Sequence, residues 1–211
     1  MVILSSNSVK TSESKISIIK IINYVSTMTE KKIDIEEAAK EVELVSKRLA
    51  LLHLVYAKTL TEELGEERGK EVILKSIKRY GRWIGEKRRK EVEEKGLEPI
   101  PENFSKGDKL RIPRFGMHSD LKGRGDSMKL YGCAMGKLWR EYGEEELGKL
   151  YCYVDPAKYM GFNEDYIQIH KRAMPAGDDL CEFVVRRSTQ KEKELFRSDE
   201  EDFSDSDEHL K

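Results

Sequence analysis

Apolar residues recur at three- to five-residue steps in the first half of the chain, a pattern typical of amphipathic helices. One such run comprises Leu44, Leu49, Leu52, Tyr56, Leu60 and Leu64. Asp34, a favourable N-cap residue, precedes this segment. Gly65 follows it, and glycine ends many helices because it adopts the left-handed conformation. The pattern therefore predicts one long helix that ends at Leu64.

A second run extends from about Glu67 to Glu94, and its apolar positions are Ile73, Ile77, Tyr80 and Ile84. Gly96 and two prolines follow and stop this helix. Two long helices joined by a short glycine turn form an antiparallel hairpin. Upstream, residues 16–28 suit either a short helix or a strand, because β-branched residues fit both patterns.

The pattern changes after residue 98. Residues 99–127 are rich in proline and glycine and poor in apolar residues, so we expect a loop-rich crossing. Met128 to Cys133 predicts a strand, Ala134 to Tyr142 a short helix, and Glu144 to Tyr153 a further helical segment.

The last strongly patterned segments, Tyr166 to Met174 and Leu180 to Arg187, alternate between apolar and polar residues. A turn-forming stretch at residues 175–179 separates them, which predicts a β-hairpin. The expected fold class is therefore α+β. An N-terminal hairpin of long helices is followed by a small α+β module that a β-hairpin closes.

We expect five segments along the chain: a disordered N-terminus (1–14), a helical region (15–98), the loop-rich crossing (99–127), an α+β module (128–188) and an acidic disordered tail (189–211). The tail is expected to be disordered because charged residues and serines dominate it and leave little apolar surface to bury.

Charge and cysteine content narrow the classes of protein. The net charge is only −1, so bulk charge gives no reason to expect nucleic acid as a partner. No segment approaches the roughly 18 consecutive apolar residues of a membrane span, so no membrane partner is expected. Three separated cysteines do not form a secreted disulfide framework, which predicts a cytoplasmic protein with reduced thiols. No P-loop is present, so no nucleotide cofactor is expected.

The most reactive side chains lie in the second half of the chain: Cys133, Cys152, Asp155, His170, Asp178 and Cys181. Thiols beside carboxylates and an imidazole suit nucleophilic catalysis or metal binding. The gaps of 18 and 28 residues between the cysteines do not match a zinc site with closely paired ligands. Whether a metal is bound is therefore unknown, and a divalent ion held by residues from separate elements stays a possibility.

Each candidate also has a structural interpretation. The thiols could be ordinary core residues, since free cysteine is among the most buried residue types. Asp155 precedes a proline and could cap a helix, and Asp178 follows a glycine and could belong to a turn.

Hairpin register decides whether His170 and Cys181 share a face of the sheet. His170 opposite Val185 would align them, whereas His170 opposite Val184 would separate them. The sequence leaves both registers open.

The run from Lys78 to Lys90 is strongly basic, and we expect most of it to be the solvated face of the second helix. The alternative is a patch that binds a carboxylate, because arginine offers a bidentate fork. Arg82 is the candidate for that role.

The chain resembles the L-2-amino-thiazoline-4-carboxylic acid hydrolase family over roughly residues 45–187. The resemblance rests on Cys133–Trp139, on residues 143–155, 161–163 and 177–183, and on the helical segment around Arg79 to Arg88. Ala134 is a departure, because members of the family commonly have proline after the first cysteine.

This resemblance implies a small-molecule hydrolase that adds water to C2 of a cyclic amidine acid and opens the ring to a carbamoyl-cysteine; the true substrate could differ. The reaction needs a group that activates water or attacks C2, an acid for the leaving atom and a cation for the substrate carboxylate. Asp155 or Asp178 would be the base, His170 the acid, and Cys133, Cys152 or Cys181 a nucleophile or metal ligand. Arg82 and Trp139 would bind the substrate.

Two other classes of function stay open. One is a sensor module that binds a small molecule or metal without turnover. The other is a structural protein whose long helices form a homo-oligomer interface and whose acidic tail recruits a basic partner.

Overall fold

The computed structural model describes residues 33–107, 109, 115–124, 127–199 and 202–211. Contacts divide the chain into a unit of residues 1–35 and a unit of residues 36–211, and the fold below is that of the second. The predictions for residues 1–14 and 16–28 lie outside the described residues.

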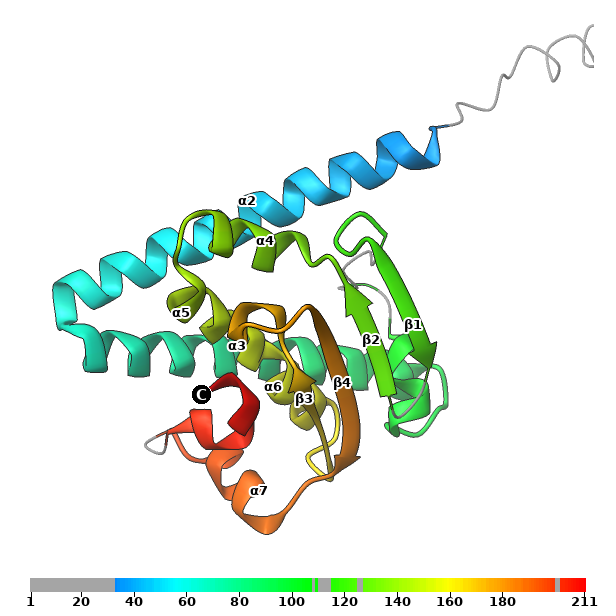
Figure 1. The fold of residues 1–211 in the computed structure, drawn as a ribbon. Helices are drawn as coiled ribbons and strands as arrows, with labels where there is room; N and C mark the ends of the chain where they lie inside the picture. The colour runs from blue at the N-terminus through cyan, green and yellow to red at the C-terminus, as the bar shows by residue number, and fades with distance from the viewer. Residues whose placement is uncertain (1–32, 108, 110–114, 125–126, 200–201) are drawn as a thin grey trace, which may run out of the picture. The chain divides into compact units, whose positions relative to one another are not determined.

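The two predicted long helices are present and run antiparallel (Figure 1). Helix α2 (Ile35–Leu64) begins directly after Asp34, and α3 (Glu66–Glu94) follows it after a single residue. That residue, Gly65, has a φ of 82°, a left-handed conformation that favours glycine. The hydrophobic spacing thus located both helices to within one residue at their junction.

The buried face of α2 differs from the expected one. Leu44, Leu52, Tyr56 and Leu64 are about half exposed, whereas the buried residues are Ser46, Ala50, His53, Leu54 and Ala57. Small side chains at Ala50 and Ala57 let α2 approach its neighbours closely. The face of α2 that packs inward is therefore the one whose small residues allow close contact with neighbouring elements, and not the one with the largest apolar side chains.

The four strands form one antiparallel sheet in the order β1-β2-β4-β3. Their bounds are β1 Asp120–Arg124, β2 Ser127–Tyr131, β3 Tyr166–Arg172 and β4 Leu180–Arg187. The expected hairpin is β3 with β4, and it lies at one side of the sheet. The fold class is α+β, as the sequence predicts.

The loop-rich crossing contains two elements that the sequence pattern did not indicate. A 3-10 helix covers Pro101–Lys106, and β1 pairs in register with β2. Strand β1 was missed because its residues are mostly polar and exposed. An edge strand is held by backbone hydrogen bonds and needs no apolar face.

Short helices connect β2 to β3: α4 (Ala134–Glu141), α5 (Glu145–Gly148), a 3-10 turn (Lys149–Tyr153) and α6 (Val154–Phe162). Helix α6 approaches α3 closely at two glycines. A Cβ at Gly85 of α3 would overlap the backbone of α6 near Lys158, and one at Gly161 would overlap Arg82. Glycines therefore bring these two helices into backbone contact.

The expectation of a disordered tail is wrong for the part of residues 189–211 that the structure describes. Helix α7 (Gln190–Arg197) starts with a capping box, and two 3-10 turns, Phe203–Ser206 and Glu208–Leu210, follow. The apolar residues Leu195, Phe196, Phe203 and Leu210 are buried. A few large side chains in an acidic background thus suffice to dock this stretch. We call residues 202–211 the C-terminal segment; it is drawn in red beside β3 in Figure 1.

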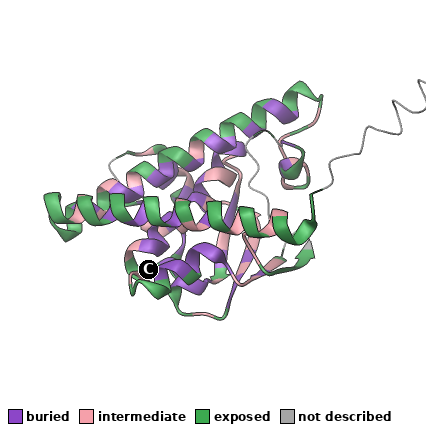
Figure 2. Cartoon of the chain, turned by 90° about the horizontal axis from the view of Figure 1, so that it is seen from above, coloured by how far each residue is buried: buried purple, intermediate pink, exposed green. Residues whose placement is uncertain are grey.

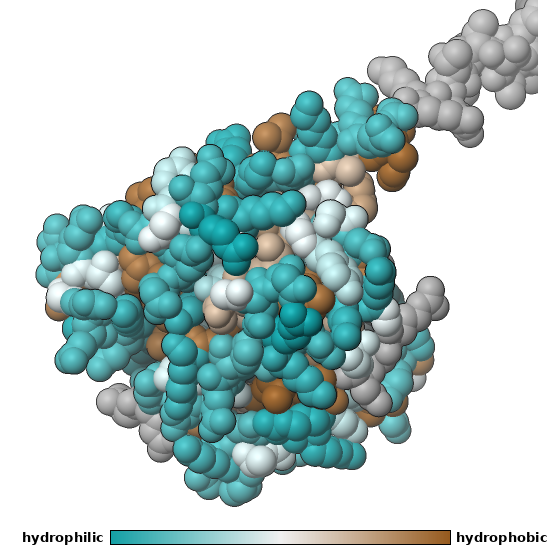
Figure 3. Space-filling model, in the orientation of Figure 1, coloured by the Kyte–Doolittle hydropathy of each residue, from teal (hydrophilic) through white to brown (hydrophobic). Residues whose placement is uncertain are grey.

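One main core joins these parts. Residues from α2, α3, α4, α6, the sheet and the C-terminal segment all contribute to it, among them Leu54, Ile77, Trp139, Met160, Phe183 and Leu210. Both long helices carry alternating bands of buried and exposed residues (Figure 2), and hydrophilic residues cover most of the face in Figure 3. No described helix is long and apolar enough to cross a bilayer.

Candidate functional site

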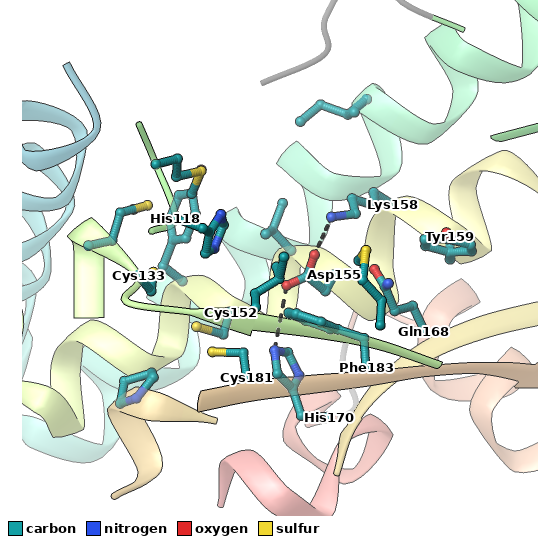
Figure 4. A pocket seen from close by; sticks show the side chains of 18 of the residues that line it. His118, Cys133, Cys152, Asp155, Lys158, Tyr159, Gln168, His170, Cys181 and Phe183 are labelled. Atoms are coloured by element: carbon teal, nitrogen blue, oxygen red, sulfur yellow. Dashed lines mark hydrogen bonds and ion pairs between the residues drawn. The ribbon is translucent and has the colours of Figure 1, made fainter. Parts of the chain in front are cut away.

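A cavity of about 170 Å³ lies among α3, α4, α6 and the sheet. Its wall includes five of the side chains that the sequence singled out for catalysis: Cys133, Cys152, Asp155, His170 and Cys181. Trp139 also borders it, and its indole nitrogen donates to the carbonyl of Ala50 at 3.1 Å. Figure 4 shows how these side chains approach one another from different elements.

His170 lies on β3, with only 3% of the residue exposed. Its Nδ1 is 2.7 Å from Oδ2 of Asp207, and its backbone nitrogen donates to the same oxygen at 2.9 Å. An ionised carboxylate can only accept, so Nδ1 carries the hydrogen in this pair. Nε2 is buried and has no hydrogen-bond partner among the described residues.

Asp155 lies close to that nitrogen, with its Oδ2 3.6 Å from His170 Nε2. Asp155 is in the first turn of α6 and forms an ion pair with Lys158 one turn later. Both side chains border the cavity (Figure 4). Because α6 is fixed against α3 by glycine contacts, this carboxylate and this ammonium have a rigid support.

The hairpin register places His170 and Cys181 on one face. His170 is opposite Phe183, which has the same parity as the aligned register considered above. Cys181 lies two residues before Phe183, and both border the cavity with His170. The aligned alternative is therefore the correct one.

The three thiols are free, and their environment keeps them protonated. Burial is the main cause in each case: it raises the pKa of Cys133, raises that of Cys181 to about 12, and raises that of Cys152 well above its ordinary value. The nearby Cys181 and Asp155 raise the pKa of the Cys152 thiol further, because they disfavour a second negative charge beside them. A nucleophilic cysteine needs a lowered pKa, so these thiols are poorly prepared for attack at neutral pH.

Two predicted residues lie away from the cavity. Arg82 donates to the carbonyl of Phe196 and stacks on that ring, with the guanidinium carbon 4.5 Å from its centre. Asp178 accepts from the backbone of Ala173 at 2.7 Å and pairs with His209 at 2.6 Å. Arg82 therefore holds α7, and Asp178 shapes the turn between β3 and β4; neither borders the cavity.

Two cations do border the cavity: Arg88 of α3 and Lys158 of α6. Arg88 is 9% exposed, and its guanidinium lies 4.5 Å from the centre of the Phe104 ring. Arg88 belongs to the basic run that we expected to be mostly solvated. Of the two arginines, Arg88 borders the cavity and Arg82 does not.

The structure also places residues at the site that the sequence argument did not select. Lys158 follows Asp155 by one helical turn, a spacing that could have indicated the ion pair. Asp207 had no such signal, because it lies in an acidic stretch 37 positions after His170. Only the apolar neighbours of that stretch hinted that it docks.

Within the described ranges, no three or more His, Cys, Asp or Glu side chains converge in an arrangement that could hold a metal ion. The possible donors on the cavity wall include buried thiols, a carboxylate already paired with Lys158, an imidazole paired with Asp207, and the imidazole of His118.

A family model provides the comparison with known proteins. The model for L-2-amino-thiazoline-4-carboxylic acid hydrolase matches residues 43–185, which include α3, strands β1 to β3, most of β4 and all five predicted residues on the cavity wall. No curated protein and no solved structure matches the chain. The match spans well over half of the 211 residues, so this chain belongs to the L-2-amino-thiazoline-4-carboxylic acid hydrolase family.

Proposed function

We propose that the protein is a small-molecule hydrolase that opens a cyclic amidine bearing a carboxylate, with L-2-amino-thiazoline-4-carboxylate as the model substrate. Family membership supports the class of reaction. The size of the cavity supports a small ligand, because about 170 Å³ is below the roughly 300–1,000 Å³ typical of pockets for drug-sized molecules.

The observation that carries the proposal is the position of His170 Nε2. This nitrogen is buried and faces a cavity beside a carboxylate. With the hydrogen on Nδ1, Nε2 offers a lone pair to a water molecule in the cavity. His170 thus suits the role of general base, and it can return the proton as an acid later in the same reaction.

The proposed reaction conserves protons as follows. Water attacks C2 while one of its protons passes to His170 Nε2 and from there to the ring nitrogen. The C2–S bond then breaks, and its electron pair goes to sulfur. The proton of the new C2 hydroxyl passes to that sulfur, which leaves a carbonyl on C2 and a free thiol in the carbamoyl-cysteine product.

Charged groups on the wall suit the two ends of this substrate. Arg88 offers a bidentate fork for the carboxylate. Asp155 can accept a hydrogen bond from the amidine nitrogens, and Lys158 limits the build-up of negative charge beside it. The cysteines would shape the apolar wall rather than attack C2, because their raised pKa values disfavour the thiolate.

We also infer a cytoplasmic location. The three free thiols support it, since reducing compartments keep cysteines in that state.

The test is turnover of L-2-amino-thiazoline-4-carboxylate by the purified protein, followed by mass spectrometry as the gain of one water molecule. His170→Gln should lower kcat by about 100-fold or more, the usual contribution of a general base. His209→Gln is the matched control, because His209 is exposed and lies off the cavity wall; it should change kcat by less than about twofold.

Full turnover by His170→Gln would reject this mechanism. Saturable binding of the thiazoline acid without any product would reject the hydrolase and favour the sensor alternative.

A further inference from the structure

The partner of His170 comes from outside the segment that the family model matches. The family match ends at residue 185, whereas Asp207 lies between the two 3-10 turns of the C-terminal segment. Asp207 is 2% exposed, and its Oδ2 receives both the side-chain and the backbone hydrogen bonds of His170.

We infer that Asp207 is a positioning residue for His170, and that the C-terminal segment completes this cavity by delivering it. The effect of Asp207 on catalysis rests on the proposed function, in which His170 is the general base. The geometric part, a carboxylate that fixes the tautomer and orientation of a buried imidazole, stands independently of the reaction.

The chemistry of the pair explains what Asp207 contributes. A neutral imidazole carries one hydrogen, on either Nδ1 or Nε2. A carboxylate at Nδ1 selects the tautomer with Nδ1 protonated, so the lone pair on Nε2 points toward Asp155 and the cavity. The same carboxylate stabilises the imidazolium that forms when Nε2 takes a proton, as carboxylate–histidine pairs do in hydrolases.

The second hydrogen bond adds orientation. One oxygen of Asp207 binds both the backbone nitrogen and the ring of His170, which ties the ring to its own strand. The ring of Phe183, 4.5 Å away between ring centres, packs against the imidazole from β4. Rotation of the imidazole is therefore restricted from two sides.

The segment has anchors that do not involve His170. Phe203 and Leu210 are buried on either side of Asp207, at 2% and 1% exposure. The hydroxyl of Tyr153 lies 3.4 Å from the carbonyls of Ser204 and Asp207. Because these contacts use the backbone of Asp207 or other residues, removal of its carboxylate leaves these anchors in place.

The decisive variant is Asp207→Ala in the full-length chain, which removes the oxygen that accepts from Nδ1. Asp205→Ala is the matched control: Asp205 is in the same segment but pairs with Lys191 and Lys211, away from His170. Circular dichroism and thermal unfolding establish that both variants fold.

The direct readout is the nitrogen NMR spectrum of protein labelled with ¹⁵N-histidine, assigned by comparison with His170→Gln. In the unmodified protein and in Asp205→Ala, the Nδ1 signal of neutral His170 should be that of a protonated nitrogen. In Asp207→Ala, neutral His170 should no longer hold its hydrogen on Nδ1 alone, so the Nδ1 signal should shift toward that of an unprotonated nitrogen. The kcat for the thiazoline acid should fall by about 100-fold, with KM changed by less than about threefold.

A neutral His170 that keeps its hydrogen on Nδ1 in a folded Asp207→Ala variant would overturn the inference. The two proposals can fail separately. If the protein lacks turnover but the Nδ1 signal still shifts in Asp207→Ala, the proposed function fails and the positioning role stands. If His170→Gln abolishes turnover while Asp207→Ala retains both the tautomer and kcat, the positioning role fails and the proposed function stands.

Discussion

Gly85 of α3 lies directly against the backbone oxygen of Lys158 in α6, so closely that a Cβ on Gly85 would overlap it. This contact joins the scaffold to the site, because α6 carries Asp155 and Lys158 and α3 carries Arg88. The separation of the two helices therefore sets the distance across the cavity between the cation of one and the carboxylate of the other.

Gly85→Ala should push α6 away from α3. We expect the free energy of unfolding to fall by about 1–3 kcal/mol, the usual cost of overpacking, and kcat to fall because Asp155 and Lys158 move with the helix. Urea titration measures the first effect. Ser76→Ala, at an exposed position of the same helix, should change stability by less than about 0.5 kcal/mol. Equal stability of the Gly85→Ala variant and the unmodified protein would contradict the close packing.

Arg88→Lys should raise KM about tenfold with little change in kcat, because lysine keeps the charge but loses the bidentate fork for the substrate carboxylate. Steady-state kinetics on the thiazoline acid measure both constants. Arg82→Lys is the matched comparison on the same helix, and its KM should stay within about twofold because Arg82 contacts Phe196 instead. If Arg82→Lys raises KM more than Arg88→Lys does, Arg82 would be the residue that binds the substrate carboxylate, as the sequence predicted.

Stability should decline in alkaline solution because of the buried thiols. The pKa of Cys181 is raised by burial from 9.0 to about 12, so the folded state holds its proton more tightly than the unfolded state. The stabilisation is complete below pH 9 and is lost as the pH rises from 9 to about 12. The slope contributed by one such thiol approaches about 1.4 kcal/mol per pH unit.

Urea titrations at several pH values between 8 and about 11 measure this slope. Cys181→Ala should flatten it relative to the unmodified chain, whatever its effect on stability at neutral pH. At pH 7, native thiols should react with a maleimide far more slowly than the same thiols in urea. An unchanged slope in Cys181→Ala, or rapid labelling of the native protein, would show that Cys181 is more accessible than its 5% exposure indicates.

Lys78→Met should loosen α7 and the C-terminal segment. The Lys78 ammonium is buried and donates to the carbonyls of Leu195, at 2.9 Å, and Ser198. Methionine fills similar space but leaves both carbonyls without this donor, which should cost about 1–3 kcal/mol. Hydrogen exchange should become faster in residues 190–210, and kcat should fall as Asp207 leaves His170.

The comparison for this variant is Lys90→Met, at an exposed position of α3. It should leave hydrogen exchange in residues 190–210 unchanged. If Lys78→Met behaves like it, the lysine is not what fastens α7.

The sequence predicted the long helices and the hairpin well because local signals define them. Spacing of apolar residues located α2 and α3, and Gly65 located their junction. The sequence prediction placed the wrong face of α2 inward because it followed the large apolar side chains and ignored how closely small residues let helices pack. At Ala50 and Ala57 the small residues are the buried ones.

The site was predictable only where residues are near one another in sequence or in a family motif. The register of His170 against Phe183 needed the pairing of two strands, which alternation alone does not specify. The role of Asp207 could not be predicted from the sequence for a different reason. Its surroundings are acidic, and the burial of Phe203 and Leu210 depends on a surface made by distant parts of the chain.

The pairing of His170 with Asp207 has a further consequence for a shortened chain. Asp207 lies 37 positions after His170, beyond the helices and strands that form the scaffold. A chain cut after α7 keeps all four strands and both long helices in its sequence but lacks the carboxylate that holds the imidazole. We therefore expect proteolysis that removes residues 202–211 to inactivate the proposed hydrolase without touching any residue on the cavity wall.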